Sequence, residues 1–240
     1  MPILDLLRAG PEIVPVIEEL DCGNVSFLDI AEHFSKHPHF ALLDSRLLTT
    51  HNDHYSFLAI RPFLIAGSKN GRAWLQTWNE REETDQDILH LLDEIARRWR
   101  FAPETHAMGA PFTGGGIGFF SYEFGRQLET ISAQPVRENG IADCCFYFYN
   151  FVLIFCHRSE KLYLSTFDPN VVGAITREEV LSELSTVGAG CYEQRLAEET
   201  ITPVARSVRA DFTPDAYLAA VNRIKDYIAA GDIYQANLTQ

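Results

Sequence analysis

The sequence from Pro111 to Glu129 reads PFTGGGIGFFSYEFGRQLE and is the most unusual stretch of the chain. Four glycines stand at positions 114, 115, 116 and 118, and glycine adopts positive φ angles that other residues avoid. The residues from Ile117 to Tyr122 are then rich in β-branched and aromatic side chains, which favours a strand. A glycine inside such a run is typical of a bulge or of a close backbone approach. We therefore expect a tight entry into a core strand of a sheet.

A phosphate-binding loop is the alternative interpretation of these glycines. Their spacing does not fit G-x-G-x-x-G, and no G-K-[ST] follows them. Nucleotide binding at Gly114 to Gly118 is therefore the weaker hypothesis. It predicts a thermal shift with ATP or NAD, and we expect none.

The composition is that of a soluble globular protein. The chain has 240 residues, of which 46% are hydrophobic and 22% charged, enough for one large or two small domains. A net charge of −13 argues against nucleic acid or an anionic membrane as a partner. The longest apolar run, residues 151–156, is far shorter than the roughly 20 residues of a membrane helix. The N-terminus lacks a signal-peptide pattern, and the five cysteines form no C-x-x-C pair, so we expect a cytoplasmic protein with reduced thiols.

The chain alternates runs of strands with a few helices. Ser26 and Asp29 form a capping-box pattern for a helix to about Lys36, and Thr84 with Asp87 can cap a helix that continues to about Arg100. Further helices are predicted at 176–184 and from Thr213 to a stop at Gly231. Strands are predicted at 40–45, where the apolar residues favour a buried strand, and at 54–60, 72–78, 117–122, 162–167 and 233–240. An edge strand or extended lead-in is predicted near 12–20, and one long central strand, straight or bent, at 144–157. We expect Trp74 and Trp78 to lie in the core.

Polar side chains follow or begin two strands that are close in sequence. Asp44 and Ser45 end the strand at 40–45, and His54, Tyr55 and Ser56 open the strand at 54–60. These groups can close one small pocket. The alternative is that they are polar simply because loops next to strands face solvent.

Three segments together resemble component I of the chorismate-using synthases, which are anthranilate synthase and aminodeoxychorismate (para-aminobenzoate) synthase. The first is the Pro-Phe-x-Gly-Gly and Gly-Phe-Phe-Ser-Tyr-Glu pattern of residues 111–129, the second is Leu42 to Phe57, and the third lies in residues 212–240, with Gly-Asp-Ile-Tyr-Gln at 231–235. The resemblance implies an α+β fold in which antiparallel β-sheets pack face to face with flanking helices.

The resemblance also implies a tryptophan pocket. In relatives the two segments Leu-Leu-Glu-Ser and Arg-Tyr-Ser-Phe help to form it, and the matching residues here are Leu43, Asp44, Ser45, His54, Tyr55 and Ser56. Asp44 stands where relatives carry a glutamate, and the shorter aspartate side chain reaches less far towards the ammonium group of a ligand. His54 stands where they carry an arginine, and histidine is largely neutral near pH 7.

For the full-length enzyme, the resemblance implies binding of Mg²⁺ and chorismate. Ammonia from a glutamine amidotransferase subunit would then replace a ring hydroxyl by an amine. The Asn237-Leu238 ending favours the aminodeoxychorismate synthase of folate biosynthesis over the anthranilate synthase of tryptophan biosynthesis. A stand-alone, non-catalytic module that binds tryptophan for regulation is the further alternative.

The resemblance implies that the catalytic and metal-binding residues of the family lie outside this chain. We find no paired carboxylates with a nearby metal-binding pattern, no Ser-His-Asp group and no activated Cys-His pair, and His157 stands alone among turn residues without a catalytic partner. We therefore expect an N-terminal component I domain at 1–190, a connector at 191–211 and a truncated start of the chorismate-binding catalytic domain at 212–240. The chain alone is predicted to be inactive.

Overall fold

The chain forms two compact units, Met1–Leu196 and Ala197–Gln240. The computed structural model describes residues 3–8, 10–21, 23, 25–45, 54–102, 110–129, 140–187 and 210–239. The boundary between the units falls in the predicted connector, of which residues 191–209 lie outside the described part. The functional assignment of the domains remains a prediction.

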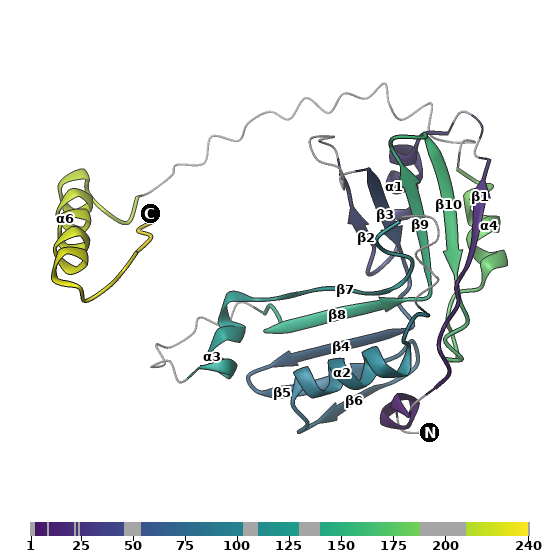
Figure 1. Cartoon of the computed structure of the whole chain (residues 1–240), viewed down its shortest axis with the longest axis horizontal. Helices are drawn as coiled ribbons and strands as arrows, with labels where there is room; N and C mark the ends of the chain where they lie inside the picture. The colour runs from purple at the N-terminus through teal and green to yellow at the C-terminus, as the bar shows by residue number, and fades with distance from the viewer. Residues whose placement is uncertain are drawn as a thin grey trace. The chain divides into compact units, whose positions relative to one another are not determined.

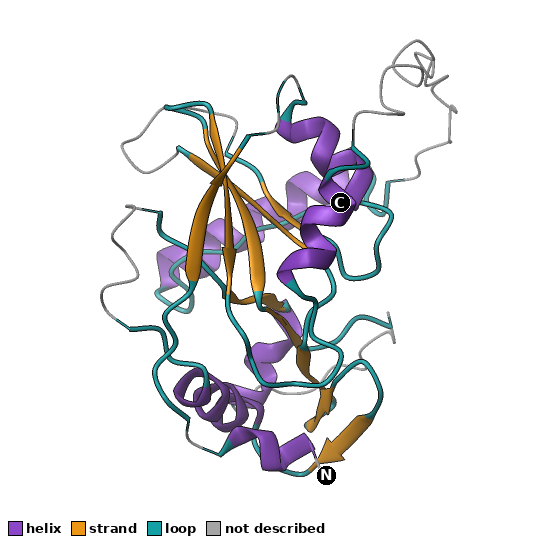
Figure 2. Ribbon diagram, turned by 90° about the vertical axis from the view of Figure 1, so that its right-hand side faces the viewer, coloured by secondary structure: helices purple, strands orange, loops and turns teal. Residues whose placement is uncertain are grey.

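The first unit contains a five-stranded antiparallel sheet in the order β1-β10-β9-β3-β2. Two helices, α1 and α4, pack on one face of this sheet, where they bury a shared apolar cluster. Figure 1 labels α1 and α4 beside the strands of this sheet, and Figure 2 shows the chain turned by 90° with helices purple and strands orange. The elements are β1 (Val16–Leu20), α1 (Phe27–Phe34), β2 (Ala41–Leu43), β3 (Tyr55–Ala59), β9 (Phe151–Cys156), β10 (Lys161–Thr166) and α4 (Arg177–Leu184).

A second five-stranded antiparallel sheet follows the order β6-β5-β4-β8-β7. Helix α2 and the short helix η1 pack against it, and Figure 1 shows α2 lying along this sheet. The elements are η1 (Ile3–Leu7), β4 (Leu64–Lys69), β5 (Arg72–Gln76), β6 (Arg81–Thr84), α2 (Ile88–Arg98), β7 (Gly115–Phe120), η3 (Tyr122–Phe124), α3 (Gly125–Leu128) and β8 (Cys144–Tyr149). Two antiparallel sheets with flanking helices confirm the predicted α+β class.

The helix starts follow their local capping residues. Ser26 and Asp29 form the predicted capping box at the start of α1. The side chain of Asp87 caps α2 by accepting hydrogen bonds from two backbone N–H groups. The predicted capping role of Thr84 is wrong, because Thr84 is the last residue of β6 and lies outside the first turn of the helix.

The glycine stretch forms the strand β7, as predicted, and lies very close to β8. A Cβ at Gly118 would stand 2.3 Å from the carbonyl oxygen of Cys145, so no other residue fits there without moving backbone. However, within the described residues β7 pairs only with β8 and is an edge strand, and Phe119 and Phe120 are 41% and 47% exposed. The prediction of a core strand is therefore wrong, while the close backbone approach is confirmed.

The apolar run 144–157 forms two strands, β8 and β9, and each belongs to a different sheet. Asn150 occupies the bend between them and is buried. Its Nδ2 donates to the carbonyl oxygens of Phe167, at 3.2 Å, and Ile175, at 2.9 Å. The single central strand predicted for this run is thus bent so sharply that it links the two sheets.

The buried clusters lie mainly between each sheet and its own helices. Two further sequence predictions are corrected here. Trp78 is 66% exposed, because β5 ends at Gln76 and the next residues turn into solvent. The strand β2 is an edge strand whose Leu43 is 47% exposed, so it is not buried as predicted. The clusters centre on Leu64, Leu75, Leu91 and Trp99 for the second sheet and on Phe34, Leu58, Leu153 and Leu164 for the first.

The second unit contains the helix α6 (Pro214–Ala230) among its described residues. Thr213 caps its start, and Gly231 ends it with a φ of 82°, both as predicted. The strand predicted at 233–240 does not form within the described residues 232–239. A strand needs a neighbour to satisfy its backbone N–H and C=O groups, and the described part of this unit offers none. Within the described chain, no helix combines the length and apolar character needed to cross a membrane.

Candidate functional site

The ends of β2 and β3 bring the predicted polar residues together. The two strands pair antiparallel, with Leu43 opposite Phe57, so the residues after β2 run beside the start of β3. The hydroxyl of Ser56 donates to Oδ1 of Asp44 at 2.7 Å. The backbone N–H of Ser45 donates to Oγ of Ser56 at 3.1 Å. Three of the six predicted residues, Asp44, Ser45 and Ser56, therefore form one hydrogen-bonded group.

A fourth member, His157, comes from the turn between β9 and β10. Its Nε2 lies 2.7 Å from Oγ of Ser56, and its backbone N–H donates to the carbonyl oxygen of His54, also at 2.7 Å. The prediction that His157 stands alone is wrong. Only the pairing of β3 with β9, which places Tyr55 opposite Cys156, brings this turn to the start of β3. We call Asp44, Ser45, Ser56 and His157 the Ser56 cluster.

The other three predicted residues lie around this cluster without hydrogen-bonding to Ser56. Tyr55 is on the opposite face of β3, because successive strand side chains alternate, and it packs beside Phe57. His54 contributes its backbone carbonyl to the cluster, and its ring lies 6.5 Å from that of Tyr55. Leu43 faces an apolar groove instead. Ligand binding by the six residues remains a prediction.

The groove at Leu43 lies between the edge strands β2 and β7 and has a volume of about 360 Å³. Residues 39–43 form one wall, and Phe119 with Tyr149 and neighbouring residues forms the other. The pKa of the Tyr149 phenol is raised, chiefly by burial. Its hydroxyl donates to the carbonyl oxygen of His39 at 2.6 Å, so a hydrogen bond joins the two walls. The groove therefore offers mainly apolar and aromatic surface.

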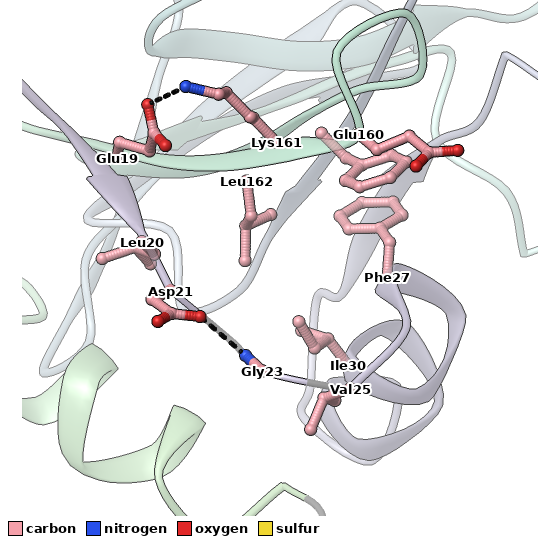
Figure 3. Close-up of a pocket in the computed structure, with 11 residues that line it drawn as sticks. Glu19, Leu20, Asp21, Gly23, Val25, Phe27, Ile30, Glu160, Lys161 and Leu162 are labelled. Carbon is pink, nitrogen blue, oxygen red and sulfur yellow. Dashed lines mark hydrogen bonds and ion pairs between the residues drawn. The ribbon is translucent and has the colours of Figure 1, made fainter.

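A second cavity, of about 330 Å³, opens between the end of β1, the start of β10 and helix α1 (Figure 3). Its floor is apolar, and the rings of Phe27 and Phe155 stack in it with their centres 5.3 Å apart. Lys161 pairs with Glu19 at 2.8 Å on its rim. None of the six predicted residues lines this cavity, but Phe155 also contacts the ring of His157.

The cysteines of the described chain are buried thiols. Burial raises the pKa of the Cys144 thiol to about 12. Burial also acts to raise the pKa of Cys156, but hydrogen bonds from Ser159, the backbone of Arg158 and Tyr55 outweigh it and lower that pKa. All three cysteines of the described chain, Cys144, Cys145 and Cys156, are free. The reduced state predicted for them agrees with this structure.

Magnesium has no candidate site in the described part of the chain. No group of three or more His, Cys, Asp or Glu side chains there could hold a metal ion. The Ser56 cluster supplies a single carboxylate, and Mg²⁺ prefers several oxygen ligands in octahedral geometry. The described residues therefore do not fit this ion.

The fold and the cluster define a class of protein: a two-sheet α+β domain with a polar cluster at one sheet's strand ends and no metal site among the described residues. Residues 46–240 match the family described as chorismate binding enzyme, and the chain belongs to this family.

Two relatives and one solved structure show the range of the similarity. The chain is 28% identical to aminodeoxychorismate synthase component 1 of Bacillus subtilis over 215 residues, which cover 89% of this chain and 44% of that protein. It is 22% identical to anthranilate synthase component 1 of the same organism over 242 residues, covering 95% and 46%. The crystal structure of anthranilate synthase component I from Streptococcus pneumoniae TIGR4 matches with a TM-score of 0.51 at 22% identity, covering 90% of this chain and 46% of that one. The chain thus spans about half the length of these relatives.

Proposed function

We propose that this chain forms the N-terminal part of an aminodeoxychorismate synthase component I, which converts chorismate to 4-amino-4-deoxychorismate for para-aminobenzoate and folate synthesis. The supporting observation is the identity of 28% to a relative of that name, against 22% to the anthranilate synthase of the same organism. The Asn237-Leu238 sequence favours the same product.

In this function the described residues support the fold of the enzyme and bind ligands, and they do not carry out the reaction. The part of the chain that the structure describes has no metal-binding group, so the proposal assigns Mg²⁺ and the reacting atoms of chorismate to residues outside it. Ammonia would come from a glutamine amidotransferase subunit. The 240-residue chain by itself is accordingly expected to leave chorismate unchanged.

Product analysis tests this proposal. The protein as its native gene encodes it is incubated with chorismate, ammonium and Mg²⁺, and the products are identified by mass spectrometry. We expect 4-amino-4-deoxychorismate. Anthranilate as the product would replace the proposal by its alternative in tryptophan biosynthesis. Turnover by the isolated 240-residue chain would contradict the supporting role.

We also propose that the Ser56 cluster and its surroundings bind L-tryptophan. The hydrogen bonds that gather Asp44, Ser45 and Ser56 support this second function, because an oriented carboxylate is suited to receive an α-ammonium group. Leu43, next in sequence to Asp44, lines the apolar groove beside β7, which offers surface for an indole ring.

Calorimetric titration with tryptophan tests this binding. We expect Asp44→Asn and Ser45→Ala to weaken it, and Asp215→Asn, an exposed acid at the start of α6, to leave it unchanged. Equal affinity of the Asp44→Asn variant and the unmodified protein would contradict the proposed site.

A further inference from the structure

Ser56 stands at the centre of three hydrogen-bonding contacts and has an exposed fraction of 0%. Its Oγ meets the N–H of Ser45 at 3.1 Å, Oδ1 of Asp44 at 2.7 Å and Nε2 of His157 at 2.7 Å. A serine hydroxyl offers one proton and two lone pairs. The three contacts therefore use its full hydrogen-bonding capacity, and each partner has a fixed role.

The roles of the partners determine where the histidine carries its proton. An ionised carboxylate can only accept, so the hydroxyl proton of Ser56 goes to Asp44. A backbone N–H can only donate, so Ser45 occupies one lone pair. The remaining lone pair faces His157, whose Nε2 must therefore carry a hydrogen and donate it to Ser56.

The imidazole ring is held in place by contacts that do not involve Asp44. The backbone N–H of His157 donates to the carbonyl oxygen of His54. The ring of Phe155 lies perpendicular to the imidazole with the two centres 4.9 Å apart, and Phe155 is itself stacked on Phe27 of α1. Phe155 is also the direct partner of Ser56 across the strand pair. The donor on His157 is thus fixed by the sheet and by α1.

We propose that His157 is a positioning residue of the amino-acid site: its Nε2–H fixes the Ser56 hydroxyl, and through it the Asp44 carboxylate, in the orientation that meets a ligand ammonium. This inference rests on the proposed tryptophan binding for its functional consequence. It adds to that function a third chain segment, the turn between β9 and β10, which no pattern in the sequence connected with the site.

The proton position is tested without any ligand. Nitrogen-15 NMR of the protein as its native gene encodes it distinguishes the two neutral histidine tautomers by the shifts of their ring nitrogens. We expect His157 to carry its hydrogen on Nε2, and the carboxyl carbon of Asp44 to change its shift in His157→Leu but not in His157→Gln. A hydrogen found only on Nδ1 would overturn the inference, whether or not tryptophan binds. So would an Asp44 carboxyl-carbon shift that is the same in both variants as in the unmodified protein.

The functional consequence is tested by conservative rescue. A glutamine at position 157 places an amide donor near the position of Nε2, an asparagine places it near Nδ1, and a leucine has none. We expect His157→Leu and His157→Asn to weaken tryptophan binding about tenfold, and His157→Gln to stay within about threefold of the unmodified protein. His90→Gln, on the exposed side of α2, is the matched control and should change nothing.

The pair of variants at 56 and 157 completes the test. Because His157 acts through Ser56, adding His157→Leu to Ser56→Ala should cause no further loss of affinity, and independent additive losses would overturn the inference. If the unmodified protein binds no tryptophan at all, the proposed binding function fails. The nitrogen shifts and the Asp44 signal then still decide whether His157 positions the carboxylate.

Discussion

The glycine stretch of β7 and the Ser56 cluster contrast in how they are encoded. The glycines are conspicuous in the sequence, and they serve close packing, since Gly118 leaves no room for a Cβ against the backbone of β8. The Ser56 cluster consists of common residues, and its members stand up to 113 positions apart, from Asp44 to His157. The unusual glycine stretch therefore reflects a steric requirement. The Ser56 cluster, in contrast, is brought together by strand pairing.

This difference has a physical basis. A backbone approach of the kind found at Gly118 excludes every residue with a side chain, so the requirement is visible at that one position. A hydrogen-bonded cluster requires only that donors and acceptors match in space. Serine and aspartate are common in loops and turns, so their presence there does not by itself indicate a site. Substitutions in the two regions should consequently differ in size and kind.

Gly118→Val is expected to have the largest effect on stability. Its Cβ would lie 2.3 Å from the carbonyl oxygen of Cys145 and 2.6 Å from Cα of Phe146, and these backbone atoms cannot move without breaking the β7–β8 pairing. We expect a loss of about 3 kcal/mol in the free energy of unfolding, measured with urea. Gly125→Ala is the control, because a Cβ there meets nothing within 4 Å, and it should change the value by less than about 1 kcal/mol. A Gly118→Val variant as stable as the unmodified protein would contradict the close approach.

Asn150→Asp tests the bend that joins the two sheets. The carboxylate keeps the size of the amide but cannot donate to the carbonyl oxygens of Phe167 and Ile175, which lose their partner in a buried place. We expect a loss of about 2 kcal/mol in the urea unfolding free energy, close to that of Asn150→Ala. If Asn150→Asp unfolds like the original protein, the donated hydrogen bonds are not what holds the bend.

Ser56→Ala should destabilise the protein less than the substitutions at Gly118 and Asn150, although it removes the central hydroxyl of the Ser56 cluster. It leaves the N–H of Ser45 and Nε2 of His157 without their shared partner, for which we expect a loss of about 1–2 kcal/mol in unfolding free energy. Ser68→Ala in β4 is the matched control. Ser68 is buried as well, but its hydroxyl has no hydrogen-bond partner within the described residues, so its removal should be neutral or slightly stabilising. Equal losses in both variants would show that burial, and not the hydrogen bonds, sets the effect.

Glu179→Gln should have the smallest effect, confined to acid pH. Hydrogen bonding to the backbone of Thr176, and then to Arg61, lowers the pKa of Glu179 below its ordinary value of 4.5. A lowered pKa contributes stability that is present above that ordinary value and is lost as the pH falls through the pKa of the folded state. The variant should therefore lose less stability than the unmodified protein as the pH falls below 4.5, with a difference below about 1 kcal/mol for this half-exposed group.

Unfolding curves at several pH values measure this difference. Glu178→Gln, the exposed neighbour whose contact to Arg177 is 3.8 Å long, serves as the control and should follow the original curve. If both glutamate variants respond alike to acid, the hydrogen bonds of Glu179 to Thr176 and Arg61 are not the source of the acid sensitivity.

Local signals predicted much of the fold. The capping box of Ser26 and Asp29, the start of α6 after Thr213 and its stop at Gly231 each depend on neighbours within one helical turn, and all three formed as expected. The predictions that failed depend on what lies beyond a segment. Trp78 is exposed because its strand ends earlier, and residues 232–239 lack a paired neighbour in the described chain.

The sequence by itself determined the α+β class, the helix ends, the glycine strand and the resemblance to a chorismate-using family, because each rests on residues that interact along the chain or at one position. Tertiary structure decided that the run 144–157 divides between two sheets at Asn150, that β7 lies at an edge, and that His157 joins Asp44 through Ser56. Strand register across 101 positions sets the last of these contacts, and register is the outcome of packing whole sheets against helices rather than of any local pattern.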